Sequence, residues 1–197
     1  MKAQNPIQLQ SGDALIVVDM QNDFLPGGSL AVPQGDEVIP MLNGYISAFK
    51  EKNLPIIATR DWHPPDHCSF KAQGGIWPPH CVRGTKGAEF APDLQLPEDV
   101  LIISKATAQE PDAYSGFDGT DLHDRLQASG IKRLFIGGLA TDYCVLNTVK
   151  DALSLDYEVY LLVDAIRAVN VNPDDDEKAG QEMIRLGAKP IDLSYIT

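Results

Sequence analysis

The sequence predicts an α/β fold, a Rossmann-like three-layer domain in which helices cover both faces of a six-stranded, mostly parallel sheet. Two observations predict it. Short runs rich in β-branched residues alternate with amphipathic stretches along the chain, as in successive strand–helix units. The 197 residues contain no internal repeat and no low-complexity linker, so we expect residues 1–197 to form a single domain.

Six apolar runs have the length and composition of buried strands. We predict them at 14–19, 54–59, 100–104, 133–138, 158–163 and 189–193. Their order in the sheet does not follow from the sequence. The amphipathic stretches predict helices at 36–52, 120–129, 142–155 and 174–187. The last has the clearest ends, because Asp174–Asp176 suits a helix start and Gly187 a helix end.

Residues 60–97 interrupt this alternation. The segment is rich in Pro, Gly, His and Trp and has no sustained period. An irregular stretch of this length inside a compact domain is usually functional or disordered. Both tryptophans and three of the four histidines fall inside it, which favours an ordered functional loop.

Charge and composition exclude several classes of partner. A net charge of −12 repels phosphate backbones and anionic lipid, so we expect a small-molecule substrate and neither nucleic acid nor membrane as partner. No apolar run approaches the roughly 20 residues that cross a bilayer. An odd cysteine count and an N-terminus without signal-peptide features predict reduced thiols and a cytoplasmic location. Whether the chain forms a homo-oligomer stays open.

Reactive side chains follow three of the predicted strands. Asp19 and Lys105 close two apolar runs, and Cys144 follows a third at the start of a predicted helix. Because the carboxyl ends of parallel strands meet at one edge, we expect the three side chains to lie together. The ammonium would lower the pKa of the thiol, and Asp19 would act as general base, since no histidine is near in sequence.

Each of these residues also has a plainer interpretation. A free cysteine is commonly a small buried apolar residue, an aspartate at a strand end often caps a turn, and a lysine there often extends its ammonium into water. The occurrence of all three at equivalent strand ends favours a covalent cysteine hydrolase.

Metal-ligating side chains gather in the irregular segment. They are Asp61, His63, His67 and His80. A carboxylate with two or three imidazoles suits one divalent ion per chain, such as Zn, Fe or Mn. Asp61 and His63 are two residues apart and would share a face of an extended strand end. Scattered loop histidines are the alternative, because the spacing matches no tight metal signature. Other residues are expected to serve packing or capping: Cys68, Cys81 and His123.

The chain resembles the nicotinamidases and pyrazinamidases of the isochorismatase-like cysteine hydrolase family. Six segments carry the resemblance in order: DMQNDF at 19–24, GGSLAV at 27–32, TRDWHPPDHCSF at 59–70, WPPHCV at 77–82, YSGF at 114–117 and GLATDYCV at 138–145. The resemblance implies the isochorismatase-like hydrolase fold. It also implies hydrolysis of nicotinamide to nicotinate and ammonia in NAD salvage, pyrazinamidase activity, and a metal that binds the pyridine nitrogen.

The resemblance assigns roles residue by residue. It implies a catalytic triad of Asp19, Lys105 and Cys144. It implies metal ligation by Asp61, His63, His80 and, in some relatives, His67. It implies a cis peptide bond at Leu139–Ala140 and an oxyanion hole from the N–H groups of Ala140 and Cys144. It implies an aromatic substrate pocket of Phe24, Trp77 and Tyr114, for which ordinary core packing is the alternative.

Other functions stay open at this stage. Relatives with the same fold cleave carbamoyl compounds or, without a cysteine, isochorismate, and the presence of Cys144 disfavours the latter. A metal-activated water could also perform hydrolysis without the thiol. A metal-stabilised interaction scaffold is disfavoured, because none of the three triad residues is missing.

Overall fold

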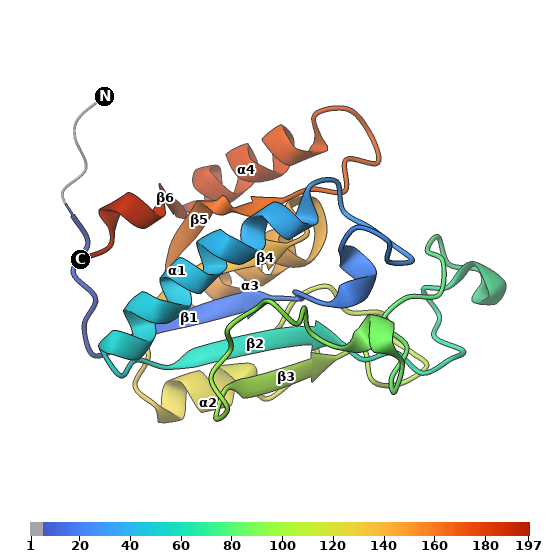
Figure 1. Ribbon diagram of the computed structural model, residues 1–197, viewed down its shortest axis with the longest axis horizontal. Coiled ribbons are helices and arrows are strands. Elements are labelled where there is room, and N and C mark those ends of the chain that lie inside the picture. The colour runs from blue at the N-terminus through green and yellow to red at the C-terminus, as the bar shows by residue number, and fades with distance from the viewer. Residues whose placement is uncertain (1–5) are drawn as a thin grey trace.

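A computed structural model describes residues 6–197, so the first five residues of the predicted domain lie outside the described part (Figure 1). Its centre is a six-stranded sheet in the order β3-β2-β1-β4-β5-β6, and all five pairings are parallel. The strands are β1 (Asp13–Val18), β2 (Ile56–Asp61), β3 (Leu101–Lys105), β4 (Arg133–Leu139), β5 (Glu158–Arg167) and β6 (Lys189–Ile191). The predicted fold class is confirmed.

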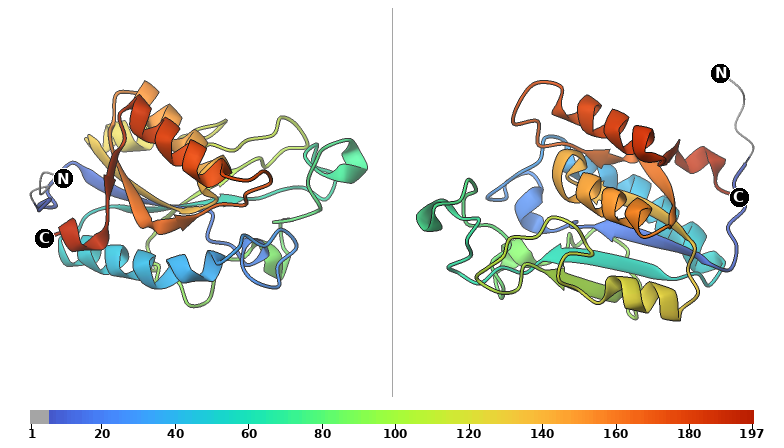
Figure 2. Two further views of the ribbon diagram at one scale, coloured as in Figure 1. Left: turned by 90° about the horizontal axis from the view of Figure 1, so that it is seen from above. Right: turned by 180° about the vertical axis from the view of Figure 1, so that it is seen from behind.

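Helices cover both faces of the sheet, which gives three layers (Figure 2). One face carries α1 (Val38–Glu51), and the other carries α2 (Leu122–Ala128), α3 (Leu146–Ser154) and α4 (Asp175–Leu186). In β1, Leu15 and Val17 join the core on the α1 side, whereas Ile16 and Val18 join the core on the other side. A strand buried on both faces has no alternation, which explains the continuous apolar run ALIVV. No described helix is long and apolar enough to span a bilayer.

Element ends differ from the predicted ones. β2 begins and ends two residues later than predicted, since Arg60 and Asp61 pair with Ser104 and Lys105 of β3. β5 runs on to Arg167 and pairs with the end of β4. The helix predicted at 142–155 opens with a π-helical turn, Thr141–Val145, that leads directly into α3. Hydrophobic period alone does not fix such ends.

The irregular segment between β2 and β3 projects beyond the carboxyl ends of the strands (Figure 1). It contains two short 3₁₀ turns, Lys71–Gln73 and Lys86–Ala88. Isolated bridges between His63 and Val82, and between Phe70 and Trp77, fix its path. The prediction of an ordered loop is therefore confirmed.

The order of the strands places a crevice between β1 and β4. The chain moves from β1 outward through β2 and β3, and then from β4 outward in the opposite direction, so connections diverge at the β1–β4 pair. Gly138 makes the close pairing there feasible. Its φ is +127°, and a Cβ atom on it would lie 2.1 Å from the carbonyl oxygen of Val18.

Candidate active site and metal centre

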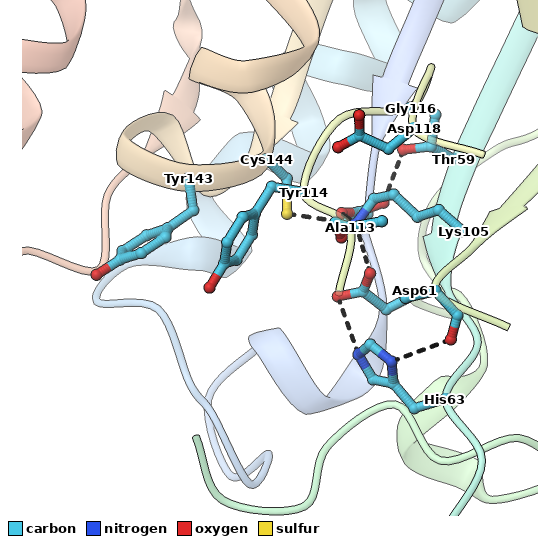
Figure 3. Close-up of polar contacts among 12 residues, drawn as sticks. Thr59, Asp61, His63, Lys105, Ala113, Tyr114, Gly116, Asp118, Tyr143 and Cys144 are labelled. Atoms are coloured by element: carbon cyan, nitrogen blue, oxygen red, sulfur yellow. Dashed lines mark hydrogen bonds and ion pairs between the residues drawn. The ribbon is translucent and has the colours of Figure 1, made fainter. Parts of the chain in front are cut away.

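The three reactive residues meet at this crevice, as predicted from the strand ends. Nζ of Lys105 lies 2.9 Å from Oδ2 of Asp19 and 3.4 Å from Sγ of Cys144. It also donates to Oδ1 of Asp61 and to the carbonyl oxygen of Ala113 (Figure 3). Lys105 is only 1% exposed, so its ammonium is held entirely by protein groups. The alternative of a lysine extended into water is wrong.

The charges in this buried cluster are set by their neighbours. Burial disfavours the ammonium of Lys105, but Asp19 and Asp61 raise its pKa well above the ordinary value. Burial also disfavours the carboxylate of Asp61, yet Lys105 and then His63 bring its pKa below the ordinary value. The pKa of Asp19 is raised, because burial outweighs the opposing charge of Lys105. Asp61 is thus the firmly ionised partner, and Asp19 is the more basic carboxylate.

The surroundings of Cys144 do not favour the thiolate form of its side chain. Burial raises the pKa of its thiol well above the ordinary value, and Lys105 opposes this shift without overcoming it. The predicted effect of Lys105 on the thiol pKa is present, but the net shift is upward. Lys105 acts in the expected direction, but the desolvation of a fully buried sulfur is larger. A neutral thiol needs a base, and Asp19 stays the predicted one.

One oxygen of Asp19 is available as that base. Its Oδ1 accepts a 2.7 Å hydrogen bond from Oγ1 of Thr59. Its buried Oδ2 pairs with the ammonium of Lys105 at 2.9 Å and has no other polar partner. Oxygen atoms of Asp19 and Asp61 and the sulfur of Cys144 all lie within 4.8 Å of one another. The free lone pair is within reach of the thiol proton.

The segment after β4 lines the same crevice. The Leu139–Ala140 peptide bond is cis, as the resemblance implies. The carbonyl oxygen of Ala140 accepts from the N–H groups of Tyr143 and Val145, at 3.1 and 3.0 Å. The N–H of Ala140 donates to no other residue in the described part of the chain. Ala140 and Cys144 both line the cavity in front of the sulfur, and an oxyanion hole from their N–H groups stays a prediction.

Asp61, His63 and His80 form a compact group that fits a divalent metal ion. Nε2 of His63 and Nε2 of His80 lie 3.6 and 3.9 Å from Oδ2 of Asp61, and all three residues are buried. Nδ1 of His63 faces the carbonyl oxygen of Ala106 at 3.4 Å, and Nδ1 of His80 faces that of Pro78 at 2.8 Å. A carbonyl only accepts, so the ring protons reside on Nδ1 and the Nε2 lone pairs are free.

Nε2 of His63 tests whether these three residues suit a metal ion. Its Nε2 is buried and makes no hydrogen bond. A buried polar atom without a partner carries an energetic penalty that a bound cation would remove. One carboxylate and two imidazoles with free lone pairs are a common donor set for zinc and similar ions. The alternative of scattered loop histidines is wrong for His63 and His80.

His67 lies beside this group rather than inside it. Its ring packs on that of His63, with 4.1 Å between centroids, and its Nδ1 contacts Oγ of Ser69 at 2.7 Å. Its Nε2 is buried and without a hydrogen bond. The compact ligand group contains Asp61, His63 and His80 and not His67. Direct metal ligation by His67 stays a prediction.

Aromatic side chains close the cavity that joins the thiol to the metal group. Trp77 Nε1 donates a 3.0 Å hydrogen bond to the hydroxyl of Tyr114, and the ring of Phe24 packs against His80. The three predicted pocket residues therefore share one cavity. Its full lining is Phe24, Leu30, Asp61, Trp77, His80, Tyr114, Ala140, Tyr143, Cys144 and Val169.

Sequence reasoning missed three residues that shape the site. Thr59 holds Asp19, Gln21 holds the backbone of Asp61, and the ring of Tyr143 packs edge-on against Trp77, 5.0 Å between centroids. A polar residue at the end of a buried strand was the signal for Thr59. Gln21 lies in the quoted DMQNDF segment, and Tyr143 adjoins the cysteine.

The remaining candidates occupy structural positions. Cys81 is buried and Cys68 half-buried, both are free, and burial raises the pKa of both thiols. His123, on α2, is half-buried, and its Nδ1 lies 3.0 Å from the hydroxyl of Tyr157. These positions agree with packing and surface roles.

Comparison with known proteins places this geometry in a family. A family model described as Isochorismatase domain matches residues 13–194. The chain belongs to this family. It is 39% identical over 196 residues to a nicotinamidase of Escherichia coli (strain K12), covering 89% of this chain and 92% of that protein. It is 37% identical over 167 residues to a nicotinamidase/pyrazinamidase of Mycobacterium tuberculosis, covering 81% and 88%.

Solved structures agree with this assignment. The pyrazinamidase of Pyrococcus horikoshii in complex with zinc has a TM-score of 0.88 and 55% identity, covering 92% of this chain and 99% of that one. PnC1 from L. infantum in complex with nicotinate has a TM-score of 0.90 and 36% identity, covering 98% of both chains. The isochorismatase-like hydrolase fold is thus shared over nearly the whole chain.

Proposed function

We propose that this protein is an amidohydrolase that converts nicotinamide to nicotinate and ammonia, serves NAD salvage, and also accepts pyrazinamide. The observation that carries the proposal is one cavity that is lined both by Cys144 and by Asp61 and His80, two of the three grouped metal-ligating residues. One end of that cavity offers a nucleophile for an amide carbon. The other offers an anchor for a ring nitrogen. Similarity to several nicotinamidases supports the choice of substrate.

Substrate positioning would depend on the cavity walls. A divalent ion held by Asp61, His63 and His80 would supply a Lewis-acid anchor for the pyridine nitrogen. The rings of Phe24, Trp77 and Tyr114 would hold the flat substrate between them and exclude water. This would direct the carboxamide carbon at the sulfur of Cys144, which is a contribution of proximity.

The reaction would proceed by two proton transfers at Asp19. In the first half, Oδ2 of Asp19 takes the thiol proton as Sγ of Cys144 attacks the carbonyl carbon. The N–H groups of Ala140 and Cys144 would hold the oxyanion, and loss of one such donor costs about 3 kcal/mol in similar sites. Asp19 then returns the proton to the departing nitrogen, which leaves as ammonia, and a thioester remains.

In the second half, Asp19 would take a proton from water, and the resulting hydroxide attacks the thioester carbon. The carbon–sulfur bond breaks, the sulfur recovers a proton, and nicotinate leaves. Lys105 would keep the charge of the cluster balanced throughout, because its raised pKa holds it as an ammonium.

Three further assignments belong to the proposal. We assign zinc to the metal group, supported by the zinc complex of the Pyrococcus horikoshii pyrazinamidase at 55% identity. We assign a cytoplasmic location, supported by the odd number of cysteines, all of them free. We treat the chain as one domain, supported by a family match that spans residues 13–194.

An ammonia-release assay with purified protein tests the function. The substrates are nicotinamide, pyrazinamide and N-carbamoylsarcosine, the last because an N-carbamoylsarcosine amidase from Thermoplasma acidophilum shares the fold at 30% identity. Release from nicotinamide that disappears in Cys144→Ser supports the proposal. Release from N-carbamoylsarcosine alone would overturn it, and metal analysis of the same sample decides between zinc, iron and manganese.

A further inference from the structure

A second set of metal-ligating atoms surrounds the ammonium of Lys105. Oxygen atoms of Asp19 and Asp61 and the sulfur of Cys144 lie within 4.8 Å of one another, the same compactness as in the Asp61–His63–His80 group. All three residues are buried. The two sets share Asp61, and Nζ of Lys105 lies inside the second set, where it contacts Asp61 (Figure 3).

The ammonium of Lys105 balances the charge of this set, but it cannot donate a hydrogen bond to every acceptor in it. An ammonium has three protons, but four acceptors surround Nζ of Lys105. They are Asp61 Oδ1, Asp19 Oδ2, Ala113 O and Cys144 Sγ. Oδ2 of Asp19 is buried, forms an ion pair with Nζ at 2.9 Å and has no other polar partner. Four ligand atoms around one cation also match the coordination number that is usual for zinc.

Two carboxylates and a thiolate are strong ligands for thiophilic divalent ions. An ion bound there would displace the thiol proton to solvent and occupy both the nucleophile and the base. The neighbouring Asp61–His63–His80 group suits the same ions, so it would bring them close to the thiol. A tethered ammonium fills the set and reaches the sulfur only through a hydrogen bond, at 3.4 Å.

We infer that Lys105 is a resident cation that occupies a second metal-ligand set, formed by Asp19, Asp61 and Cys144, and excludes divalent ions from the thiol. Only the histidine group then binds an ion, and the chain holds one ion instead of two. The inference concerns the ligand sets alone and does not rest on the identity of the amide substrate. Its test measures bound metal, so its failure is distinct from failure of the proposed function.

Cobalt titration of metal-free protein tests the inference, because cobalt bound to a thiolate gives a sulfur-to-metal charge-transfer absorption that cobalt bound to imidazole and carboxylate does not give. The wild-type chain is expected to bind one Co²⁺ without this absorption. Lys105→Met is expected to bind two, with the absorption arising from the second ion. Lys105→Met combined with Cys144→Ser should lose the absorption, which assigns it to Cys144 rather than to Cys68 or Cys81.

Lys105→Arg is the matched control, since it keeps a cation in the set and is expected to bind one Co²⁺ without charge transfer. The inference is overturned if Lys105→Met binds a single ion with no thiolate absorption. It is equally overturned if the wild-type chain shows thiolate absorption.

A measurement on the wild-type chain covers the case in which Lys105→Met does not fold. Zinc is added in excess over the histidine group, and alkylation of Cys144 by iodoacetamide is followed by mass spectrometry of the peptide. The alkylation rate is expected to be the same with one equivalent of zinc and with the excess. A rate that falls as zinc exceeds one equivalent would mean that Lys105 does not exclude the second ion.

Discussion

The side-chain amide of Gln21 pairs with both main-chain polar groups of Asp61. Its Nε2 donates to the carbonyl oxygen, and its Oε1 accepts from the N–H, each at 2.8 Å. β1 ends at Val18, so the side chain of Gln21 makes the hydrogen bonds to the end of β2 that a longer β1 backbone would make. Nε2 also donates to the carbonyl oxygen of Ala88, at 2.9 Å. Gln21 thereby fixes the residue that both ligand sets share.

Gln21→Glu is expected to weaken metal binding by about 10-fold or more, the usual effect of losing a group that orients a ligand. The substitution keeps the shape of the side chain but removes the donor, so its oxygens would face the carbonyls of Asp61 and Ala88. Competition with a chromogenic chelator measures the dissociation constant. Gln127→Glu, on the exposed end of α2, is the control. Equal affinity in both variants would contradict the orienting role.

Thr59→Val is expected to move the acid limb of the pH profile of kcat/KM to higher pH. The hydrogen bond from Thr59 lowers the pKa of Asp19 against the larger, raising effect of burial. Without it the pKa of Asp19 rises further, and the carboxylate needed as base is lost at a higher pH. Thr85→Val, at an exposed turn, should leave the limb in place. A limb that does not move in Thr59→Val, or that moves to lower pH, would show that Asp19 is not the group being titrated.

Cys144→Ala is expected to abolish turnover while nicotinamide binding, measured by calorimetry, is retained. The cavity walls and the metal group do not depend on the sulfur, whereas the thioester requires it. Cys68→Ala removes a half-buried thiol outside the cavity lining and should keep full activity. Ammonia release at a near-normal rate from Cys144→Ala would favour the metal-activated water instead.

His63→Ala is expected to lower metal content and raise KM for nicotinamide, because it removes one of the three grouped ligands. His67→Ala resolves whether the histidine packed on His63 also ligates. An unchanged metal content in His67→Ala assigns it a packing role, and a content as low as in His63→Ala makes it a ligand. His123→Ala, on α2, serves as control. Metal content in His63→Ala equal to that of the control would remove His63 from the site.

Gly138→Ala is expected to destabilise the fold by about 3 kcal/mol or more, since its Cβ would overlap the backbone of β1 at a φ that other residues rarely adopt. The matched control is Gly180→Ala inside α4, where a Cβ meets no atom within 4 Å. That change should be neutral or stabilise by about 0.5–1 kcal/mol, as alanine does in a helix. Urea unfolding followed by circular dichroism compares the two. Similar midpoints would mean that β4 can move away from β1.

The sequence predicted the elements better than their arrangement. Strand-forming runs are local, so Asp19, Lys105 and Cys144 could be placed at strand ends, but the order that makes β1 and β4 neighbours is a property of the whole chain. The hydrogen bonds of Thr59 and Gln21 join residues 40 positions apart and leave no local pattern. The protonation of Cys144 depends on how far burial exceeds the effect of Lys105, which spacing does not reveal.

Several residues proposed for substrate choice come from a different part of the chain than the residues proposed for bond cleavage. Asp19, Lys105 and Cys144 follow sheet strands, whereas His63, Trp77 and His80 belong to the segment that projects beyond the sheet (Figure 2). Mutations in that segment can therefore alter which amide is accepted while the cleaving groups keep their positions. Enzymes with this architecture can therefore evolve toward new nitrogen-containing substrates through substitutions in one loop.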